Sequence, residues 1–395
     1  MRPAPALALA AAAPTSVRCF VPLAPLTQLH LDVRVMRSPA ASRSMTSLNM
    51  SLLDQVRDRT TLWADTADSD AVFQLRSSVW DVTTNPSIVC KAAKIVKNAP
   101  FLAGTPEMYT DDGGKMAVGK MEEHLAVNIG VTLLGTVPGR VCTQLDIRLR
   151  DDAEQMVDKA HQLLDMYSKA GADPSRVLIK TPATWAGIRA TERLEKQGVR
   201  CLVTLVCSET QGRAAAEAGA SIMATYVGRV SDWHRQAQGR QQPFPAGEDP
   251  GVALTQSLNA FCRHGGHATE VMAASFRNVG QVLALAGCEH LTVAPDLIHE
   301  LAALPEMGAR DFEAAAAIPD SIIRAAAAAA KGAARITQAD YDRALSLDEC
   351  GGQVLARSIA GFLEDTVEME EAFRRHLAAE AAAVVGESGV TAAGA

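Results

Sequence analysis

A single lysine closes an apolar, β-branched run, and its position indicates covalent chemistry. The run RVLIK (176–180) is typical of a strand buried on both faces, and Lys180 stands at its end. At the rim of a core, partial removal from water disfavours the ammonium form and favours the free amine. A neutral amine attacks carbonyl carbons and forms Schiff bases. A lone lysine would more often extend to solvent, so the neighbouring residues decide between the two interpretations.

Other polar side chains stand at the ends of the remaining apolar runs. Singly, each has an ordinary explanation: an aspartate after a strand usually caps a helix, and an arginine usually faces solvent. One amine, one acid, one amide and two arginines grouped at strand ends instead indicate an active site for a phosphorylated carbonyl substrate. The polar residues at these strand ends are Asp65, Asn85, Gln144, Lys180, Thr204, Tyr226, Arg229, Ser275 and Arg277.

The elements that must position these side chains follow from hydrophobic patterning. After about residue 50, short apolar runs alternate with helical stretches, which predicts an α/β fold, a (β/α)8 barrel with extra C-terminal helices spanning 50–380. In such barrels catalytic groups come from the carboxyl ends of strands. A two-domain doubly wound fold fits less well, because no G-x-G-x-x-G follows a strand. The predicted strands are 61–64, 78–82, 140–145, 176–180, 200–206, 221–227, 270–275 and 290–294.

Several helix boundaries have their own signals. Gly198 predicts the end of the helix 191–197. Ser208 with Gln211 forms a capping-box pattern, and Asp249–Pro250 predicts an N-cap followed by a first helical residue.

Five further segments complete the predicted organisation. The stretches 99–116 and 234–248 are polar, and we expect long loops there. The Ala-rich segment 314–334 and the stretch 352–378 are expected to be helical, and 381–395 a flexible tail.

Composition limits the class of protein. The chain has 395 residues, 48% hydrophobic and 21% charged, with a formal net charge of −7, so we expect no nucleic-acid partner. No stretch approaches the roughly 18 apolar residues of a membrane span, and we expect no membrane partner. No CxxC pair is present, and several cysteines sit in apolar runs, which predicts buried reduced thiols and no zinc site or disulfide framework. The cysteines are residues 19, 90, 142, 201, 207, 262, 288 and 350.

Residues 1–49 differ in composition from the rest. They contain five arginines but one acid, Asp32, and are rich in Ala, Ser, Thr and Pro. This composition is typical of an organelle transit peptide, and the weak amphipathicity favours a plastid over a mitochondrion. A disordered extension is the alternative, and Met45 or Met50 could start a shorter, cytoplasmic form.

Several long motifs, in order along the chain, resemble those of the transaldolase family. The resemblance covers roughly residues 52–375. It implies a barrel that transfers a three-carbon dihydroxyacetone unit through a Schiff base, without metal or organic cofactor. The donors would be sedoheptulose 7-phosphate or fructose 6-phosphate, and the acceptors glyceraldehyde 3-phosphate or erythrose 4-phosphate, in the non-oxidative pentose phosphate pathway. The motifs are DVTTNPS (81–87), VLIKTPATWAGIRATERLEKQG (177–198), YVGRVSDW (226–233), ASFRNV (274–279) and AGCEHLTVAPDLIHEL (286–301).

The resemblance also implies roles for the matching positions. Lys180 would attack the ketose carbonyl, and Asp65 would take and return the proton of the C4 hydroxyl. Asn85, with Thr83 in the same motif, would bind the dihydroxyacetone fragment, and Thr204 would position a water molecule. The phosphate group would be bound by a separate set, Arg229, Ser275 and Arg277.

Some positions depart from the usual transaldolase pattern. Gln144 stands where a glutamate is usual, and Tyr226 where a phenylalanine is usual. With Leu202 and Ala224, these residues resemble the fructose-6-phosphate aldolase branch, which releases free dihydroxyacetone. Three interpretations therefore remain: a transaldolase, which we favour, an aldolase-like lyase, and a non-catalytic barrel with a binding or regulatory role. The oligomeric state is left open between monomer and homodimer.

Overall fold

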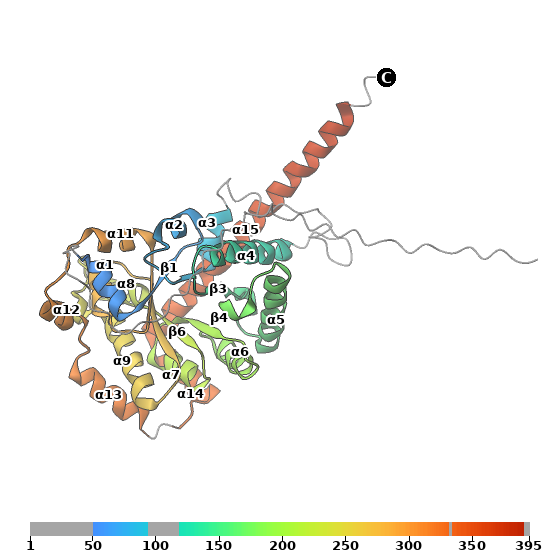
Figure 1. The fold of residues 1–395 in the computed structure, drawn as a ribbon. Helices are drawn as coiled ribbons and strands as arrows, with labels where there is room; N and C mark the ends of the chain where they lie inside the picture. The colour runs from blue at the N-terminus through green and yellow to red at the C-terminus, as the bar shows by residue number, and fades with distance from the viewer. Residues whose placement is uncertain (1–49, 94–117, 332–333, 391–395) are drawn as a thin grey trace, which may run out of the picture. The chain divides into compact units, whose positions relative to one another are not determined.

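The structure, a computed structural model, describes residues 50–93, 118–331 and 334–390. The predicted transit segment and the predicted loop at 99–116 lie outside the described residues. Eight parallel strands form a closed barrel in sequence order, each paired with the next and β8 with β1. The predicted (β/α)8 fold with extra C-terminal helices is therefore confirmed (Figure 1).

The strands are short and lie close to the predicted runs. They are β1 (Thr61–Asp65), β2 (Asp81–Thr83), β3 (Val141–Gln144), β4 (Val177–Pro182), β5 (Cys201–Val206), β6 (Ile222–Tyr226), β7 (Glu270–Ala274) and β8 (His290–Val293).

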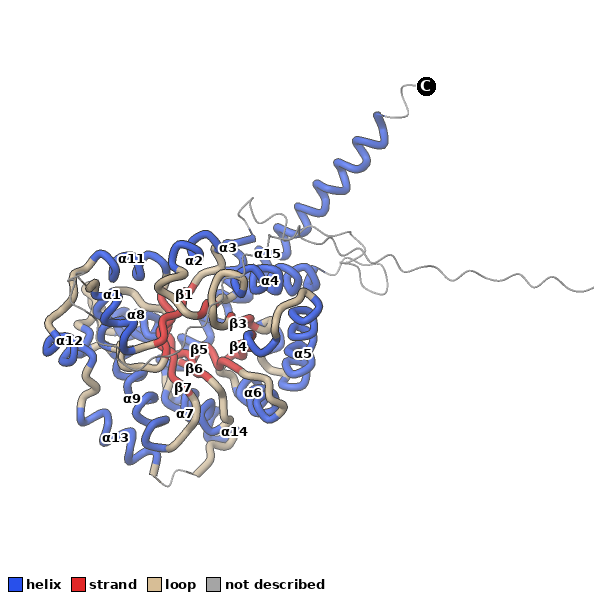
Figure 2. Tube along the Cα trace, viewed as in Figure 1, coloured by secondary structure: helices blue, strands red, loops and turns tan. Residues whose placement is uncertain are grey.

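Helices surround the strands (Figure 2). They are α1 (Leu52–Arg59), α2 (Ser69–Leu75), α3 (Pro86–Ala93), α4 (Val118–Leu134), α5 (Ala153–Lys169), α6 (Trp185–Lys196), α7 (Glu209–Glu217), α8 (Val227–Ala237), α9 (Pro250–Gly265), α10 (Val279–Ala284), α11 (Pro295–Ala303), α12 (Ala309–Ala316), α13 (Asp320–Ala330), α14 (Gln338–Leu347) and α15 (Glu349–Val390), with short 3-10 turns η3 (Ile147–Leu149), η4 (Pro174–Arg176) and η5 (Ala246–Glu248). No helix in the described part of the chain combines the length and apolar character that crossing a bilayer requires.

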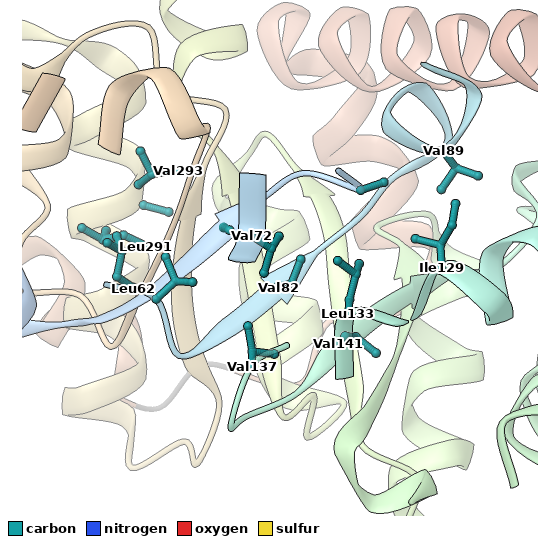
Figure 3. Close-up of a cluster of buried hydrophobic side chains, with 14 of the residues drawn as sticks. Leu62, Val72, Val82, Val89, Ile129, Leu133, Val137, Val141, Leu291 and Val293 are labelled. Carbon is teal, nitrogen blue, oxygen red and sulfur yellow. The ribbon is translucent and has the colours of Figure 1, made fainter. Parts of the chain in front are cut away.

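Two apolar layers hold the barrel together. The inner layer fills the lower barrel, and alternation along β4 puts Leu178 in that layer and Lys180 above it on the same side. The outer layer lies between strands and helices, where Val82 and Val141 of adjacent strands pack in one cluster with Leu133 of α4 (Figure 3). The inner layer consists of Trp63, Cys142, Leu178, Leu202, Ile222, Ala224 and Met272.

The prediction for the second strand was wrong at its start. The strand begins at Asp81, not at residue 78, because the amides of Ser78 and Val79 both donate to the carbonyl of Leu75 in a turn that follows α2. Trp80 is left 52% exposed before the strand begins. The apolar residues between this turn and Asp81 therefore made the predicted strand longer than the observed one.

Helix caps agree with most of the sequence signals. The Asp249 carboxylate accepts hydrogen bonds from the first-turn amides of α9, and Gly198, with a φ of 82°, follows the end of α6. The capping box at α7 is only half formed. Ser208 accepts from the amide of Gln211, but the Gln211 side chain accepts from the amide of Cys207 instead of that of Ser208.

Three predicted segments differ from the expectation. The predicted loop 234–248 begins inside α8 and ends in η5. The Ala-rich segment is divided between α12 and α13, because Pro319 interrupts it. The predicted helix at 352–378 is longer, since α15 extends from Glu349 to Val390. The division into transit segment, barrel and flexible tail stays a prediction. The seven described cysteines are buried and free.

Candidate active site

A cavity opens at the carboxyl ends of the strands, with a free volume of about 390 Å³ including its mouth. Seven of the ten predicted site residues line it, and they come from β1, β2, β4, β6 and the segments that follow these strands and β7. The seven are Asp65, Thr83, Asn85, Lys180, Tyr226, Arg229 and Ser275.

Lys180 stands in the wall of this cavity and is only 4% exposed. Its strand β4 is buried along its whole length, as a parallel barrel strand must be. The side-chain nitrogen donates a 3.0 Å hydrogen bond to the carbonyl oxygen of Thr84, which follows β2. This contact holds the side-chain nitrogen beside the segment after β2, in the wall of the cavity where a substrate carbonyl could meet it.

Asp65, the last residue of β1, is an acid that lines the same cavity as Lys180. Burial raises the pKa of its carboxyl group, whereas the Lys180 charge, a hydrogen bond from Thr83 and the Arg229 charge oppose that rise. The Thr83 hydroxyl donates to Asp65 at 2.9 Å and lies 2.7 Å from the hydroxyl of Thr292. Since Thr83 uses its proton on Asp65, Thr292 must donate to Thr83. A carboxyl group with a raised pKa holds a proton more readily, which suits a group that must take a proton and later return it.

Thr292 was missed by the sequence reasoning. It lines the cavity from β8 and is 3% exposed. The signal that could have found it is a lone hydroxyl inside the apolar run HLTV (290–293).

Thr204 and Tyr226 form a hydroxyl pair on adjacent strands. The Thr204 hydroxyl donates to the Tyr226 phenol oxygen at 3.1 Å. The pairing of β5 with β6 shifts between Val203 and Val206, and Leu205 inside this irregularity has a φ of 66°. A non-glycine residue in the left-handed region marks strain that the surrounding packing must hold.

Gln144 occupies the position next to Lys180, because β3 and β4 pair these two residues in register. Both polar atoms of its side-chain amide are buried, and neither has a hydrogen-bond partner among the described residues. An amide in this state is ready to bind a substrate hydroxyl or a water molecule. Asn85 is engaged differently: its side-chain oxygen accepts a 3.0 Å hydrogen bond from the amide of Ile88 in α3.

Ser275 and Arg277 follow β7 and form one unit. Arg277 donates to the carbonyl oxygen of Ser275 at 2.9 Å and to its hydroxyl at 3.2 Å, and Ser275 has a φ of 64°. The amide of Gly228 also donates to the Ser275 carbonyl. On its other side Arg277 pairs with Asp232 of α8 at 2.9 Å, a partner that sequence reasoning missed.

Arg229 reaches the same cavity from α8. Its guanidinium lies 4.8 Å from the centre of the Tyr226 ring and 5.5 Å from that of Phe362 in α15. Aromatic faces hold the group without consuming its N–H donors.

One group of side chains away from the cavity resembles a cation site by composition. Potential ligand atoms of Cys90, Asp365 and Glu368 lie within 4.8 Å of one another between α3 and α15. Ser87 donates to Asp365, and the Cys90 thiol to Glu368 at 3.8 Å. Protein hydrogen bonds therefore already serve both carboxylates.

The closed barrel with its polar cavity at the carboxyl ends of the strands defines a (β/α)8-barrel enzyme. The chain belongs to the transaldolase/fructose-6-phosphate aldolase family, whose family model matches residues 62–373. It is an enzyme of that family, and the resemblance seen in the sequence is confirmed.

Individual relatives agree with this assignment. A transaldolase of Vibrio parahaemolyticus is 40% identical over 320 residues, covering 80% of this chain and 96% of that protein. A transaldolase of Vibrio campbellii is 45% identical over 253 residues, covering 64% and 79%. Transaldolase B of Pasteurella multocida is 43% identical over 257 residues, covering 64% and 80%.

Proposed function

We propose that this enzyme transfers a dihydroxyacetone unit from a ketose phosphate to an aldose phosphate through a Schiff base on Lys180. Sedoheptulose 7-phosphate or fructose 6-phosphate would be the donor, and glyceraldehyde 3-phosphate or erythrose 4-phosphate the acceptor, in the non-oxidative pentose phosphate pathway. The single observation that carries the proposal is a 4% exposed lysine that shares one cavity with Asp65. A lysine in such a place forms imines, and the neighbouring acid can move protons.

The proposed reaction assigns one step to each group. Lys180 adds to the C2 carbonyl, and loss of water gives the iminium ion. Asp65 takes the C4 hydroxyl proton while the C3–C4 bond breaks, so the first aldose leaves and the bond's electron pair becomes an enamine on Lys180. Asn85 and Thr83 hold the three-carbon fragment. The enamine then attacks the second aldehyde, whose oxygen regains the proton from Asp65, and water releases the new ketose.

The proposed phosphate site is formed by Arg229, Ser275 and Arg277. Arginine N–H groups match phosphate oxygens in geometry and charge. Ser275 and Arg277 are already joined by hydrogen bonds, which supports their acting together. Losing one charged hydrogen bond to phosphate costs about 1.5–3 kcal/mol, so Arg277→Ala should lower kcat/KM by about one to two decades on phosphorylated substrates. A free dihydroxyacetone donor should be less affected, and equal losses on both would make Arg277 structural.

Covalent trapping tests the central step. Borohydride added with fructose 6-phosphate should reduce the imine and leave a mass adduct on the peptide that contains Lys180. The Lys180→Met variant should keep its fold and lose both the adduct and turnover. An adduct on a different lysine, or active enzyme without an adduct, would contradict the assignment.

A second activity, release of free dihydroxyacetone, is favoured by the hydroxyl pair beside the lysine. The phenol of Tyr226 is held 3.1 Å from Thr204, and the Gln144 amide next to Lys180 is without a partner among the described residues. Together they can hold a water molecule that protonates the enamine carbon and then hydrolyses the imine. The result would be lyase activity alongside transfer.

Product analysis separates the two activities. Free dihydroxyacetone is measured with fructose 6-phosphate, with and without erythrose 4-phosphate. Tyr226→Phe should lower the ratio of release to transfer. The lyase proposal fails if wild type releases no more than Lys180→Met, or if Tyr226→Phe leaves the ratio unchanged.

We also propose that residues 1–49 direct the enzyme to a plastid, on their Arg-rich, acid-poor composition. A fluorescent reporter fused behind this segment should leave the cytosol. Cytosolic retention would reject the proposal, and a mitochondrial signal would correct the destination. We further propose that the enzyme acts as a monomer or homodimer without a nucleic-acid partner, which the net charge of −7 supports.

A further inference from the structure

A second pocket lies on the outer side of Arg229. It is formed between α8 and α15, has a free volume of about 450 Å³ and includes Asp232 and Trp233 of α8 and Arg357 of α15. Arg229 lines both this outer pocket and the catalytic cavity, so its guanidinium is a shared wall. The outer pocket therefore adjoins the catalytic cavity through a single cationic side chain.

Two arginines of the outer pocket have no carboxylate partner. Neither Arg229 nor Arg357 forms an ion pair within the described part of the chain. The one acid in the wall, Asp232, is paired with Arg277 at 2.9 Å and with Arg235 at 3.4 Å. The charge that faces the pocket is therefore positive, and an anion would not be repelled by a free carboxylate.

Neighbouring side chains position both guanidinium groups while leaving most of their N–H donors free of hydrogen bonds. Arg229 lies against two aromatic rings, which leaves its N–H groups unspent. Arg357 donates one hydrogen bond, at 3.3 Å, to the side-chain oxygen of Gln353, which also accepts from the Trp233 indole at 3.0 Å. The Gln353 oxygen thus links Arg357 to Trp233. Four of the five N–H donors of the Arg357 guanidinium stay available for a ligand.

We propose that the outer pocket binds a phosphoryl group between Arg229 and Arg357. Guanidinium groups on two separate elements, with unspent donors, match the oxygens of a phosphate dianion. Because Arg229 is shared, a phosphate bound outside takes donors that would otherwise serve the substrate inside. The inference rests on the proposed function only in treating the catalytic substrates as phosphorylated.

Binding of inorganic phosphate tests the pocket directly. Isothermal titration calorimetry at constant ionic strength compares wild type with Arg357→Gln. The control is Arg375→Gln, which removes an equal charge from an exposed position of α15 that is paired only weakly, at 3.8 Å, with Glu371. We expect Arg357→Gln to weaken one phosphate site about tenfold, the effect of one charged hydrogen bond, and Arg375→Gln to leave both sites unchanged.

Trp233 supplies the second measurement, because it lines the outer pocket and not the catalytic cavity. Phosphate should change its fluorescence in wild type, using Trp233→Phe as the blank, and the change should disappear in Arg357→Gln. Equal phosphate affinity in Arg357→Gln and wild type, or equal losses in Arg357→Gln and Arg375→Gln, would overturn the proposal. The proposed function is tested separately, by wild-type turnover with fructose 6-phosphate and erythrose 4-phosphate. Phosphate binding to the outer pocket can be measured whether or not that turnover is observed.

Discussion

Asp65 is a residue of the site whose proton affinity is changed by its surroundings in the barrel. Enclosure raises the pKa of its carboxyl group, while Lys180, Thr83 and Arg229 restrain that rise. The balance matters because a general base must be a carboxylate when substrate binds and a competent acid when the proton is returned. Thr292 affects this balance through Thr83, whose hydroxyl lies between Thr292 and Asp65.

The first prediction concerns the pH dependence set by Thr83. Its hydrogen bond favours the charged form of Asp65, so Thr83→Val should raise the pKa of that carboxyl group further. Activity that needs the carboxylate is lost as pH falls through this pKa. The acid limb of the kcat/KM profile should therefore move to higher pH. Thr83→Ser, which keeps the hydroxyl, is the control.

Profiles measured with fructose 6-phosphate and erythrose 4-phosphate decide the matter. An acid limb that stays in place in Thr83→Val, with only a lower plateau, would mean that Thr83 positions the substrate and does not tune Asp65.

Most of the site residues could be predicted from their positions at the ends of apolar strands. Lys180 and Tyr226 could be predicted because alternation along a barrel strand sends every second side chain inward. Asp232 could not, because it lies inside an amphipathic helix and meets Arg277 only through the packing of α8 on the segment after β7. The sequence has no local pattern for such a pair.

Between elements, the closest approach in the site is that of α8 to the segment after β7. Gly228 in the first turn of α8 donates its amide to the carbonyl oxygen of Ser275 at 3.0 Å. A Cβ atom at position 228 would stand 2.2 Å from that oxygen and 2.8 Å from the Arg277 side chain. Glycine is therefore required there by space, since the obstacle is backbone and Ser275 is itself held at a positive φ.

The second prediction follows from this approach. Gly228→Ala should displace Ser275 and Arg277, raise KM for phosphorylated substrates about tenfold or more, and lower the free energy of unfolding by about 1–3 kcal/mol. Gly361→Ala in α15 is the matched control, because nothing lies within 4 Å of a Cβ atom there. It should leave KM unchanged and stabilise slightly, as alanine favours helix over glycine. Equal KM values for both variants would show that the site tolerates the displacement.

Element types were predictable, and element ends were less so. Seven strands lie within one or two residues of their predicted bounds, because each is a buried apolar run between helices. The second strand was predicted to start too early because Trp80, an exposed residue of a strand-favouring type, and the residues before it extend the apolar run ahead of Asp81, where the strand begins. The predicted loop 234–248 failed for the opposite reason: α8 continues through polar residues, because its apolar face ends before its helical hydrogen bonds do.

At the scale of the whole molecule, α15 joins parts that are distant in sequence. It contacts α3, α4 and α8, and through Phe362 it faces Arg229 at the site. Phe373, further along the helix, is fully buried in the main apolar cluster. The length of the helix could not be predicted, since its later turns are rich in alanine and glutamate without an apolar repeat that marks an end. The position of α15 depends on its contacts with α3 and α4, which are brought together only when the barrel closes.

Arg148 links α15 to the barrel through ion pairs. It pairs with Asp146 at 2.6 Å, with Glu370 of α15 at 2.6 Å and with Glu122 of α4 at 3.4 Å. One cation thus faces three carboxyl groups, and its distance to Glu122 is the longest of the three. One oxygen of Glu122 is buried and has no hydrogen-bond partner among the described residues. Burial raises the pKa of Glu122 to about 8, with Asp146 and Glu370 adding to the rise and Arg148 opposing it.

The third prediction is a loss of stability with rising pH. Between its unfolded pKa near 4.5 and its folded pKa of about 8, Glu122 holds a proton in the folded state that the unfolded chain has released. Folding stability therefore falls as pH rises through this window, by a few kcal/mol at most. Glu122→Gln keeps a neutral side chain at every pH and should remove this slope, so the variant should exceed wild type in stability at pH 8.5 and match it near pH 5.

Urea unfolding at pH 5, 7 and 8.5 measures the slope. Glu371→Gln is the control, because Glu371 follows Glu370 in α15, is 57% exposed and lies in a weak pair with Arg375. Its stability should follow the wild-type dependence on pH. If Glu122→Gln retains the wild-type slope, Glu122 is already ionised in the fold, and Arg148 then balances three full charges between α4, η3 and α15. In that case Glu122→Gln would also weaken the docking of α15, and its stability would fall below that of wild type at every pH above 5.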